Sequence, residues 1–169
     1  MVENKEKGLF EKQLVIFSIG TEKFGVDISE VREIIKLEGI TKIPDTAEYI
    51  DGIINLRGRI IVIIDLAKKL VMKSNDRGKD TRIIVIESGD NAIGMVVDNC
   101  SEVIRLNTSQ IEPAPKIVTK KINSDFLEGV GVMKEGLIML LALHKVIDNL
   151  DEITTIINNT KEKSAIAVN

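Results

Sequence analysis

Apolar residues occur in short runs along this chain, and glycine or polar residues separate the runs. Residues 13–19 and 23–28 are rich in Val, Ile and Phe, and Gly20, Thr21 and Glu22 separate them, which predicts a β-hairpin. The other predicted strands are 50–54, 60–64, 82–86, 92–97, 101–106, 129–133 and 137–141. Many short strands with glycine turns favour an all-β barrel fold with a few short helices.

Helical signals are few and short. Ser29 occupies an N-cap position before residues 31–35, whose apolar positions are spaced by three and four, so we predict a helical turn there. A second turn is predicted at 65–70. A short amphipathic helix is predicted past His144, from the spacing of Ile153, Ile156 and Ile157. Residues 73–80 are a polar connection, and Pro113 and Pro115 enforce an extended path.

The pattern of the first half returns in the second half. Residues 49–66 and 126–143 align without a gap at an offset of 77, with apolar on apolar and glycine on glycine. The loops inside them differ, because the first reads Asn-Leu-Arg-Gly-Arg and the second Val-Met-Lys-Glu-Gly. Shorter matches align Gly25 with Gly94 at an offset of 69, and Val31 with Val103 at 72. We interpret this as duplication into two small subdomains, although chance similarity is easier to sustain for the shorter matches.

Composition narrows the functional class. The chain has 169 residues, enough for one ordinary domain or two very small ones that share a core. The net charge of −3 and the few aromatic residues, with no tryptophan, argue against a basic nucleic-acid binder that stacks on bases. The single cysteine, Cys100, is interpreted as a small buried hydrophobe. Residues 1–7 lack the apolar core of a signal peptide and no apolar run could span a bilayer, so we expect a cytoplasmic protein.

No residue pattern indicates catalysis, a cofactor or a metal site. The only histidine, His144, matches Ala67 of the first copy, and we interpret it as a half-exposed residue at a strand end rather than a catalytic base. The two glycines of 129–131 lack the third glycine and the crossover helix of a dinucleotide-binding motif. The remaining candidates are carboxylates at strand ends, where aspartate commonly serves turns and caps: Asp27, Asp51, Asp65 and Asp98.

Two features point to a binding surface, and each has a second interpretation. Arg57 at a hairpin tip is either a solvated cation or a guanidinium presented to a partner carboxylate, and spacing alone favours the first. Val31 and Val103 are either core residues or the walls of a seam between the two subdomains.

Residues 49–66 closely resemble the signature of the CheW family of bacterial chemotaxis coupling proteins, above all in the Asn-Leu-Arg-Gly block within its apolar frame. Residues 24–28, 94–98 and 126–129 support the resemblance in the family order. The resemblance implies two five-stranded SH3/OB-like β-barrel subdomains, packed together with exchanged strands, within residues 12–150. Residues 1–11 are then expected to be a flexible segment, and 151–169 a short helix with a polar tail.

The same resemblance implies a non-enzymatic adaptor that joins the histidine kinase CheA, through its regulatory domain, to the cytoplasmic tips of methyl-accepting chemoreceptors. It further implies self-association within receptor arrays, recruitment from the cytoplasm to those arrays, and no nucleic-acid binding or membrane insertion. The implied receptor-side positions are Val31, Glu33, Gly52, Asn55, Arg57 and Val103. The implied kinase-side positions are Thr81, Arg82, Glu112 and Ile117. Gly94 matches a family glycine with a structural role, and Arg57 becomes a partner or seam anchor.

Two other functions would fit part of the pattern. An OB-like nucleic-acid or small-ligand module would share the barrel type, but the chain lacks a basic stripe and aromatic residues. CheV-like proteins fuse this module to a receiver domain, and the kinase carries it at its own C-terminus. With 19 residues after Leu150, we expect neither extension.

Overall fold

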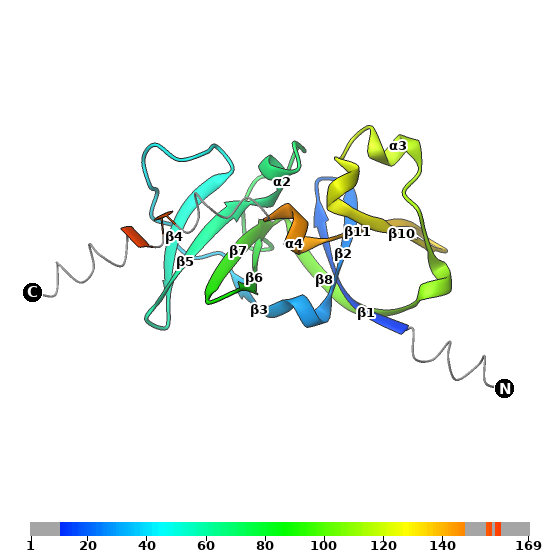
Figure 1. Ribbon diagram of the computed structural model, residues 1–169, viewed down its shortest axis with the longest axis horizontal. Coiled ribbons are helices and arrows are strands. Elements are labelled where there is room, and N and C mark those ends of the chain that lie inside the picture. The colour runs from blue at the N-terminus through cyan, green and yellow to red at the C-terminus, as the bar shows by residue number, and fades with distance from the viewer. Residues whose placement is uncertain (1–10, 148–154, 157, 160–169) are drawn as a thin grey trace, which may run out of the picture.

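A computed structural model describes residues 11–147, 155–156 and 158–159. These residues form two β-sheets side by side, with short helical turns at their edges (Figure 1). The strands are β1 (Glu11–Ile19), β2 (Glu22–Asp27), β3 (Val31–Lys36), β4 (Ile50–Leu56), β5 (Arg59–Asp65), β6 (Arg82–Ser88), β7 (Asn91–Val97), β8 (Asn99–Asn107), β9 (Ile111–Glu112), β10 (Leu127–Met133) and β11 (Gly136–Leu141). The helices are η1 (Ile28–Glu30), α2 (Leu66–Lys69), η2 (Thr108–Gln110), α3 (Lys116–Thr119), η3 (Ser124–Phe126) and α4 (Leu143–Val146).

The predicted hairpins are confirmed. β1 pairs with β2, β4 with β5, β6 with β7 and β10 with β11, all antiparallel. The predicted turn after β5 is also confirmed, since Asp65 caps α2 with its side chain. The all-β fold class with a few short helices is therefore correct.

Each sheet combines strands from both halves of the chain. One sheet, which we call barrel B, has the order β3-β6-β7-β5-β4, and the other, barrel A, has the order β8-β1-β2-β11-β10-β9. The repeat aligns β1, β2 and β8 with β6, β7 and β3, so the two orders match strand for strand except for the two-residue β9. Each half therefore gives its first hairpin to the other barrel, which confirms the predicted strand exchange.

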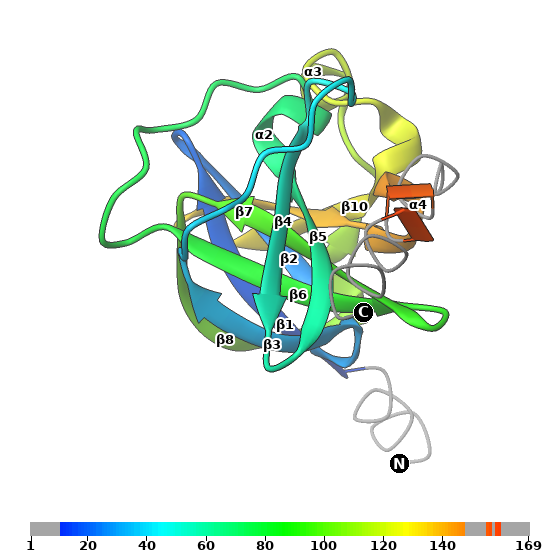
Figure 2. The same ribbon diagram turned by 90° about the vertical axis from the view of Figure 1, so that its left-hand side faces the viewer.

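The apolar clusters show that each sheet curls around its own interior. The interior of barrel B includes Ile35 from one edge strand and Ile54 from the other. The interior of barrel A likewise joins Leu106 of β8 to Ile111 of β9. In Figure 2, which looks onto barrel B, β4 and β5 cross in front of β3 and β6 rather than running alongside them. The largest cluster lies between the barrels, on the outer faces of both sheets.

The helical turn predicted at 31–35 is wrong. Residues 28–30 form η1, whose N-cap is Asp27, while β3 begins at Val31. The half-buried and exposed residues of β3 alternate, and its backbone pairs with β6 from Val31↔Ile86 to Lys36↔Arg82. Because so short a run fits a period of two or of 3.6, pairing with a strand fifty residues away decides its conformation.

The match of Val31 with Val103 is also wrong in three dimensions. Val31 lies opposite Ile86, whereas Val103 lies opposite Val15, and β1 and β6 are related by an offset of 69 rather than 72. The equivalent of Val103 is therefore Ile34, and the equivalent of Val31 is Cys100. Both Val31 and Cys100 pack against the core between the barrels, while Ile34 and Val103 are exposed.

Several predictions concern the ends of the chain. β1 already begins at Glu11, inside the segment expected to be flexible. His144 lies in α4, and residues 155–156 and 158–159 are helical, with Ile156 buried in the core between the barrels. Ile153, Ile157, residues 1–10 and residues 160–169 lie outside the described residues.

Candidate functional site

The tip of the β4–β5 hairpin is a two-residue turn. Arg57 and Gly58 both have positive φ, 52° and 84°, as a type I′ turn requires. The side-chain oxygen of Asn55 accepts a hydrogen bond of 2.8 Å from the Gly58 amide and closes the turn. Asn55 thus shapes the loop, while the Arg57 side chain, 66% exposed, points from it.

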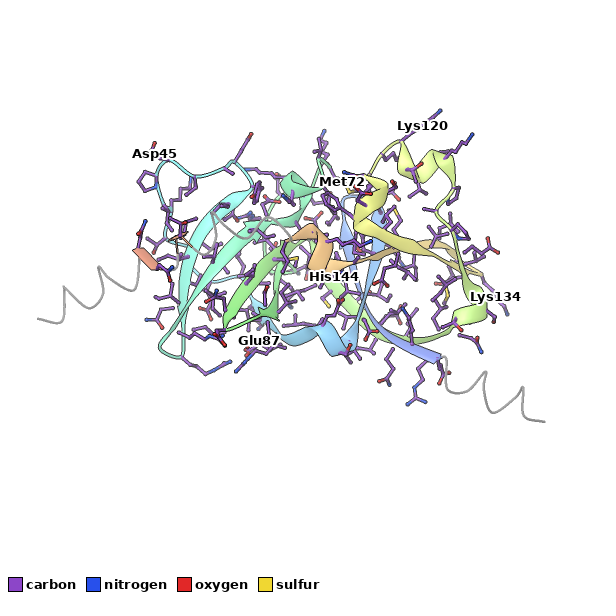
Figure 3. The ribbon with its side chains drawn as sticks, viewed as in Figure 1. Asp45, Met72, Glu87, Lys120, Lys134 and His144 are labelled. Atoms are coloured by element: carbon purple, nitrogen blue, oxygen red, sulfur yellow. The ribbon has the colours of Figure 1, made fainter. Side chains whose placement is uncertain are left out.

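The matching tip of the β10–β11 hairpin has a different backbone. Here Gly136 carries the positive φ, 136°, and neither Lys134 nor Glu135 does. The two tips also lie at opposite ends of the molecule, since the β4–β5 tip is at the lower left of Figure 1 and Lys134 is at the right of Figure 3. The two aligned hairpin loops therefore differ in backbone geometry as well as in charge.

Arginines and glutamates connect the loops at one end of barrel B. Arg57 pairs with Glu33 of β3, and Arg32 pairs with Glu87 of β6. Arg59 holds both oxygens of Glu87, at 2.9 and 3.1 Å. Hydrogen bonds from Arg59 first, and from Arg32, lower the pKa of Glu87 against the opposing effect of desolvation. Such exposed pairs each contribute only about 0–1 kcal/mol, so their main effect is to orient the side chains.

A groove of about 610 Å³ opens at the seam between the barrels. Its walls come from η1, the start of β3, the end of β6 and α4, and Val31 lies among the apolar residues that line it. Glu30 and His144 approach each other across it, with 3.6 Å between Oε1 and Nδ1. Figure 3 shows His144 near the middle of the molecule and Glu87 at the lower edge of barrel B. Desolvation, followed by the charge of Glu128, raises the pKa of Glu30, and His144 partly offsets this.

The structure brings only some of the predicted receptor-side residues together. Glu33 and Arg57 form an ion pair, and Val31 lines the neighbouring groove. Val103 is exposed on β8 of the other barrel and is not among the residues that line this groove. Gly52 is buried at a β-bulge with φ 146°, where an added Cβ would lie 2.0 Å from the backbone oxygen of Thr41. Gly52 is therefore required by the backbone.

The predicted kinase-side residues lie on both barrels. Thr81 is only 3% exposed, and its hydroxyl accepts a hydrogen bond of 2.9 Å from the Gly78 amide. The half-buried Arg82 donates to the backbone oxygens of Lys79 and Thr81, at 2.8 and 3.0 Å. In barrel A, Glu112 is exposed on β9 and Ile117 is exposed on α3. Thr81 thus shapes the start of β6 rather than offering its side chain.

The strand-end carboxylates serve structural roles, as expected. Asp27 accepts from the Ser29 amide, Asp65 from the Lys68 amide, and Asp98 from the amides of Gly20 and Asn75. Within the described part of the chain, no group of three His, Cys, Asp or Glu residues is arranged to hold a metal ion. No helix among those same residues is long and apolar enough to cross a membrane.

Sequence reasoning missed the residues that act through distant partners. Glu30 and His144 of the groove are 114 positions apart, and neither belongs to a motif. The pairing of Arg77 with Asp51 and Asp65 was missed as well. Residue type carried no signal for these contacts, because the partners are far apart in the chain and only the fold brings them together.

Comparison with known proteins identifies the same architecture. Residues 13–151 match the model of the CheW-like domain. The chain is 34% identical to the chemotaxis protein CheW of Klebsiella aerogenes, over 82% of each chain. It is 31% identical to CheW of Helicobacter pylori, over 80% of this chain and 81% of that one. Its structure superimposes on the crystal structure of the scaffolding protein TtCheW from Thermoanaerobacter tengcongensis with a TM-score of 0.74 and 41% identity, covering 80% of this chain and 87% of that chain. The fold, the exchanged hairpins and these similarities together show that the chain belongs to the CheW family of chemotaxis proteins.

Proposed function

We propose that this chain is a non-enzymatic adaptor that couples the histidine kinase CheA to the cytoplasmic tips of methyl-accepting chemoreceptors. The observation that carries the proposal is the seam groove with the Arg57 hairpin beside it, in a member of the CheW family. An adaptor of this kind needs no reactive group, because coupling requires only different affinities for different states of its partners.

The receptor side is the groove together with the ordered arginine tip. Apolar lining from Val31, Ile86, Leu143 and Ile147 is flanked by charged residues such as Glu30 and Arg32. An apolar floor with a charged rim suits one face of an amphipathic helix. Glu33 and Arg57 extend this surface along barrel B, and Asn55 holds the tip in place. Val103 is a separate exposed position on barrel A, outside the groove, while Gly52 acts indirectly by permitting the bulge.

The kinase side uses the start of β6 in barrel B, with Arg82 at its surface and Thr81 beneath it. A second face lies around Glu112 and the exposed Ile117 of barrel A. The regulatory domain of the kinase is itself built of similar barrels, so barrels of the two proteins pack end to end. The same faces support self-association in receptor arrays.

The protein works in the cytoplasm and is recruited to membrane chemoreceptor arrays. Each contact can be small and weak, because repeated contacts within an array raise the effective concentration. Contacts with the array are therefore sufficient to recruit the protein.

The test is a pull-down and a calorimetric titration with a kinase regulatory domain and a receptor cytoplasmic fragment. The wild-type chain is expected to bind both in one ternary complex. Val31→Glu places a charge in the groove and is expected to weaken receptor binding at least tenfold, with Arg57→Ala weakening it by about threefold to tenfold. Kinase binding should change less than twofold in either variant.

The matched control is Val71→Glu, the same change at an exposed valine of the α2 turn outside the groove. It should bind both fragments as the wild type does. Circular dichroism checks that each variant is folded. If Val31→Glu is unfolded, Val31 is required for the core and not for receptor binding. Failure of the wild-type chain to bind either fragment at high micromolar concentration would refute the adaptor function.

A further inference from the structure

The polar connection between α2 and β6 is anchored along its length. Residues 73–80 are all exposed and contain no helix or strand, which is typical of a flexible loop. Yet hydrogen bonds hold it at Asn75, Arg77 and Gly78. The connection therefore has one arrangement that specific side chains impose.

Arg77 provides the contact to barrel B. Its guanidinium lies 3.0 Å from the carboxylate of Asp65 and also pairs with Asp51. The side chains of Asp65 and Asp51 are only 10% and 13% exposed. Asp65 also caps α2 through the Lys68 amide, and Asp51 lies in the bulge of β4. Removal of Arg77 would leave two nearly buried carboxylates without this cation. The loss of this contact should therefore cost more free energy than the loss of an exposed ion pair.

Asp98 provides a second anchor, towards barrel A. One oxygen of its carboxylate accepts hydrogen bonds from the Asn75 amide at 2.8 Å and from the Gly20 amide at 2.6 Å. Gly20 lies in the β1–β2 turn, and an added Cβ there would stand 2.7 Å from the backbone oxygen of Lys73. The first half of the connection is thus packed against the other barrel.

The second half of the connection leads directly to the start of β6. The amide of Gly78 donates to the Thr81 hydroxyl, and the amide of Thr81 donates to the Gly78 oxygen at 3.1 Å. Arg82 closes the unit by donating to the Lys79 oxygen. Because Gly78 follows Arg77 in the chain, the position of Arg77 determines where this closed unit begins.

We propose that Arg77 is a positioning residue for the kinase-side surface: its contacts with Asp51 and Asp65 hold residues 78–82 in the arrangement that a partner barrel recognises. This role rests on the proposed adaptor function. Arg77 itself need not touch the partner. Its contribution is pre-organisation, since a surface that is already ordered loses less conformational freedom on binding.

The experiment compares the full chain with Arg77→Ala, Arg77→Lys and the control Lys73→Ala. Lys73→Ala removes an exposed cation from the same connection, outside residues 78–82, and keeps the backbone that packs against Gly20. Amide hydrogen exchange is measured at Asn75, Gly78 and Thr81. Affinities are measured by calorimetry for the kinase regulatory domain and for the receptor fragment.

Arg77→Ala is expected to speed exchange at Gly78 and Thr81 by about tenfold or more and to weaken kinase binding by about fivefold to tenfold. Receptor binding should stay within about twofold, because the groove lies on other elements. Arg77→Lys keeps the positive charge but lacks the planar guanidinium that can bind two carboxylates. Its exchange rates and kinase affinity should lie between those of the wild type and Arg77→Ala. Lys73→Ala should behave as the wild type. Should Arg77→Ala fail to fold, Asp51→Asn weakens the same contact and is measured in its place.

Unchanged exchange, or equal losses of kinase affinity in Arg77→Ala and Lys73→Ala, would overturn the positioning role. A wild-type chain that binds the kinase while Arg77→Ala binds it equally well overturns that role alone. A wild-type chain that binds neither fragment overturns the adaptor function, and the role of Arg77 in it falls too.

Discussion

Three residues other than glycine have positive φ in the described part of the chain: Asp45, Arg57 and Val71. Arg57 belongs to a turn whose geometry demands that conformation. Val71 is less expected, because a β-branched side chain fits the left-handed region poorly. It follows α2, where its amide bonds to the Lys68 oxygen, and its φ is 57°. Glycine is the usual residue at such a helix end.

Val71→Gly is therefore expected to stabilise the protein. The side chain is 87% exposed, so its removal forfeits almost no burial. Relief of left-handed strain should outweigh the extra freedom of glycine in the unfolded chain, for a net gain of about 0.5–1 kcal/mol. Urea denaturation measures the change in the midpoint.

The control is Val132→Gly, at a partly exposed position within strand β10, which should instead destabilise by about 1 kcal/mol. A lower midpoint for Val71→Gly would contradict the strain at this position.

At the scale of elements, the duplication places equivalent glycines inside the two barrels. Gly25 of β2 lies within the apolar interior of barrel A, and Gly94 of β7 lies within that of barrel B. An added Cβ at Gly25 would meet its nearest neighbours at 3.2 Å. At Gly94 it would stand 2.5 Å from the Cδ1 atom of Ile63 and 2.7 Å from Cγ2 of Ile83. The two barrels differ in how much space these strands leave.

Gly94→Ala should destabilise the protein by about 2–3 kcal/mol, and Gly25→Ala by about 1 kcal/mol or less, because overpacking cost rises with the displacement required. Thermal and urea denaturation of the two variants measure the difference. Ile63→Val removes the Cδ1 atom and should recover part of the loss when combined with Gly94→Ala. Equal effects at the two glycines would contradict the difference in packing.

Hairpins could be predicted from the sequence because both strands and their turn lie within about twenty residues, and each strand repeats with a period of two. Residues 28–36 could not, since their apolar spacing suits a helix as well as a strand. Pairing with β6 settled the question in favour of a strand. Short elements therefore depend on partners that the local pattern does not contain.

At the scale of the whole molecule, the seam between the barrels creates surfaces that neither barrel has alone. The groove takes its walls from η1 and β3, from β6, and from α4. Burial there, and the nearby charge of Glu128, raise the pKa of Glu30 above its usual value. The charged form of Glu30 is thus disfavoured by folding, and His144 offsets only part of this cost.

The sign of the pH dependence follows from this shift. Between the unfolded pKa near 4.5 and the raised folded pKa, the native state binds more protons at Glu30 than the unfolded state does. Stability from this group is therefore fully present below pH 4.5 and is lost as pH rises through the folded pKa. Glu30→Gln should remove that loss, so the variant should be more stable than the wild type at pH 7 but not at pH 4.

Thermal melts of both proteins between pH 4 and pH 8 check this expectation. NMR titration of the Glu30 carboxyl in the wild type reports the shift directly. A midpoint for Glu30→Gln below that of the wild type at pH 7 would mean that the contact with His144 outweighs burial.

The sequence by itself determined the four hairpins, the duplication and the family resemblance, because these depend on residue types and spacings that are close in the chain. It also identified Asn55 and Arg57, whose turn is local. Only the tertiary structure decided that Val31 is equivalent to Cys100, that Thr81 is buried, and that Arg77 holds Asp51 and Asp65. Those facts depend on the register of distant strands and on charges brought together across the fold, which no local pattern records.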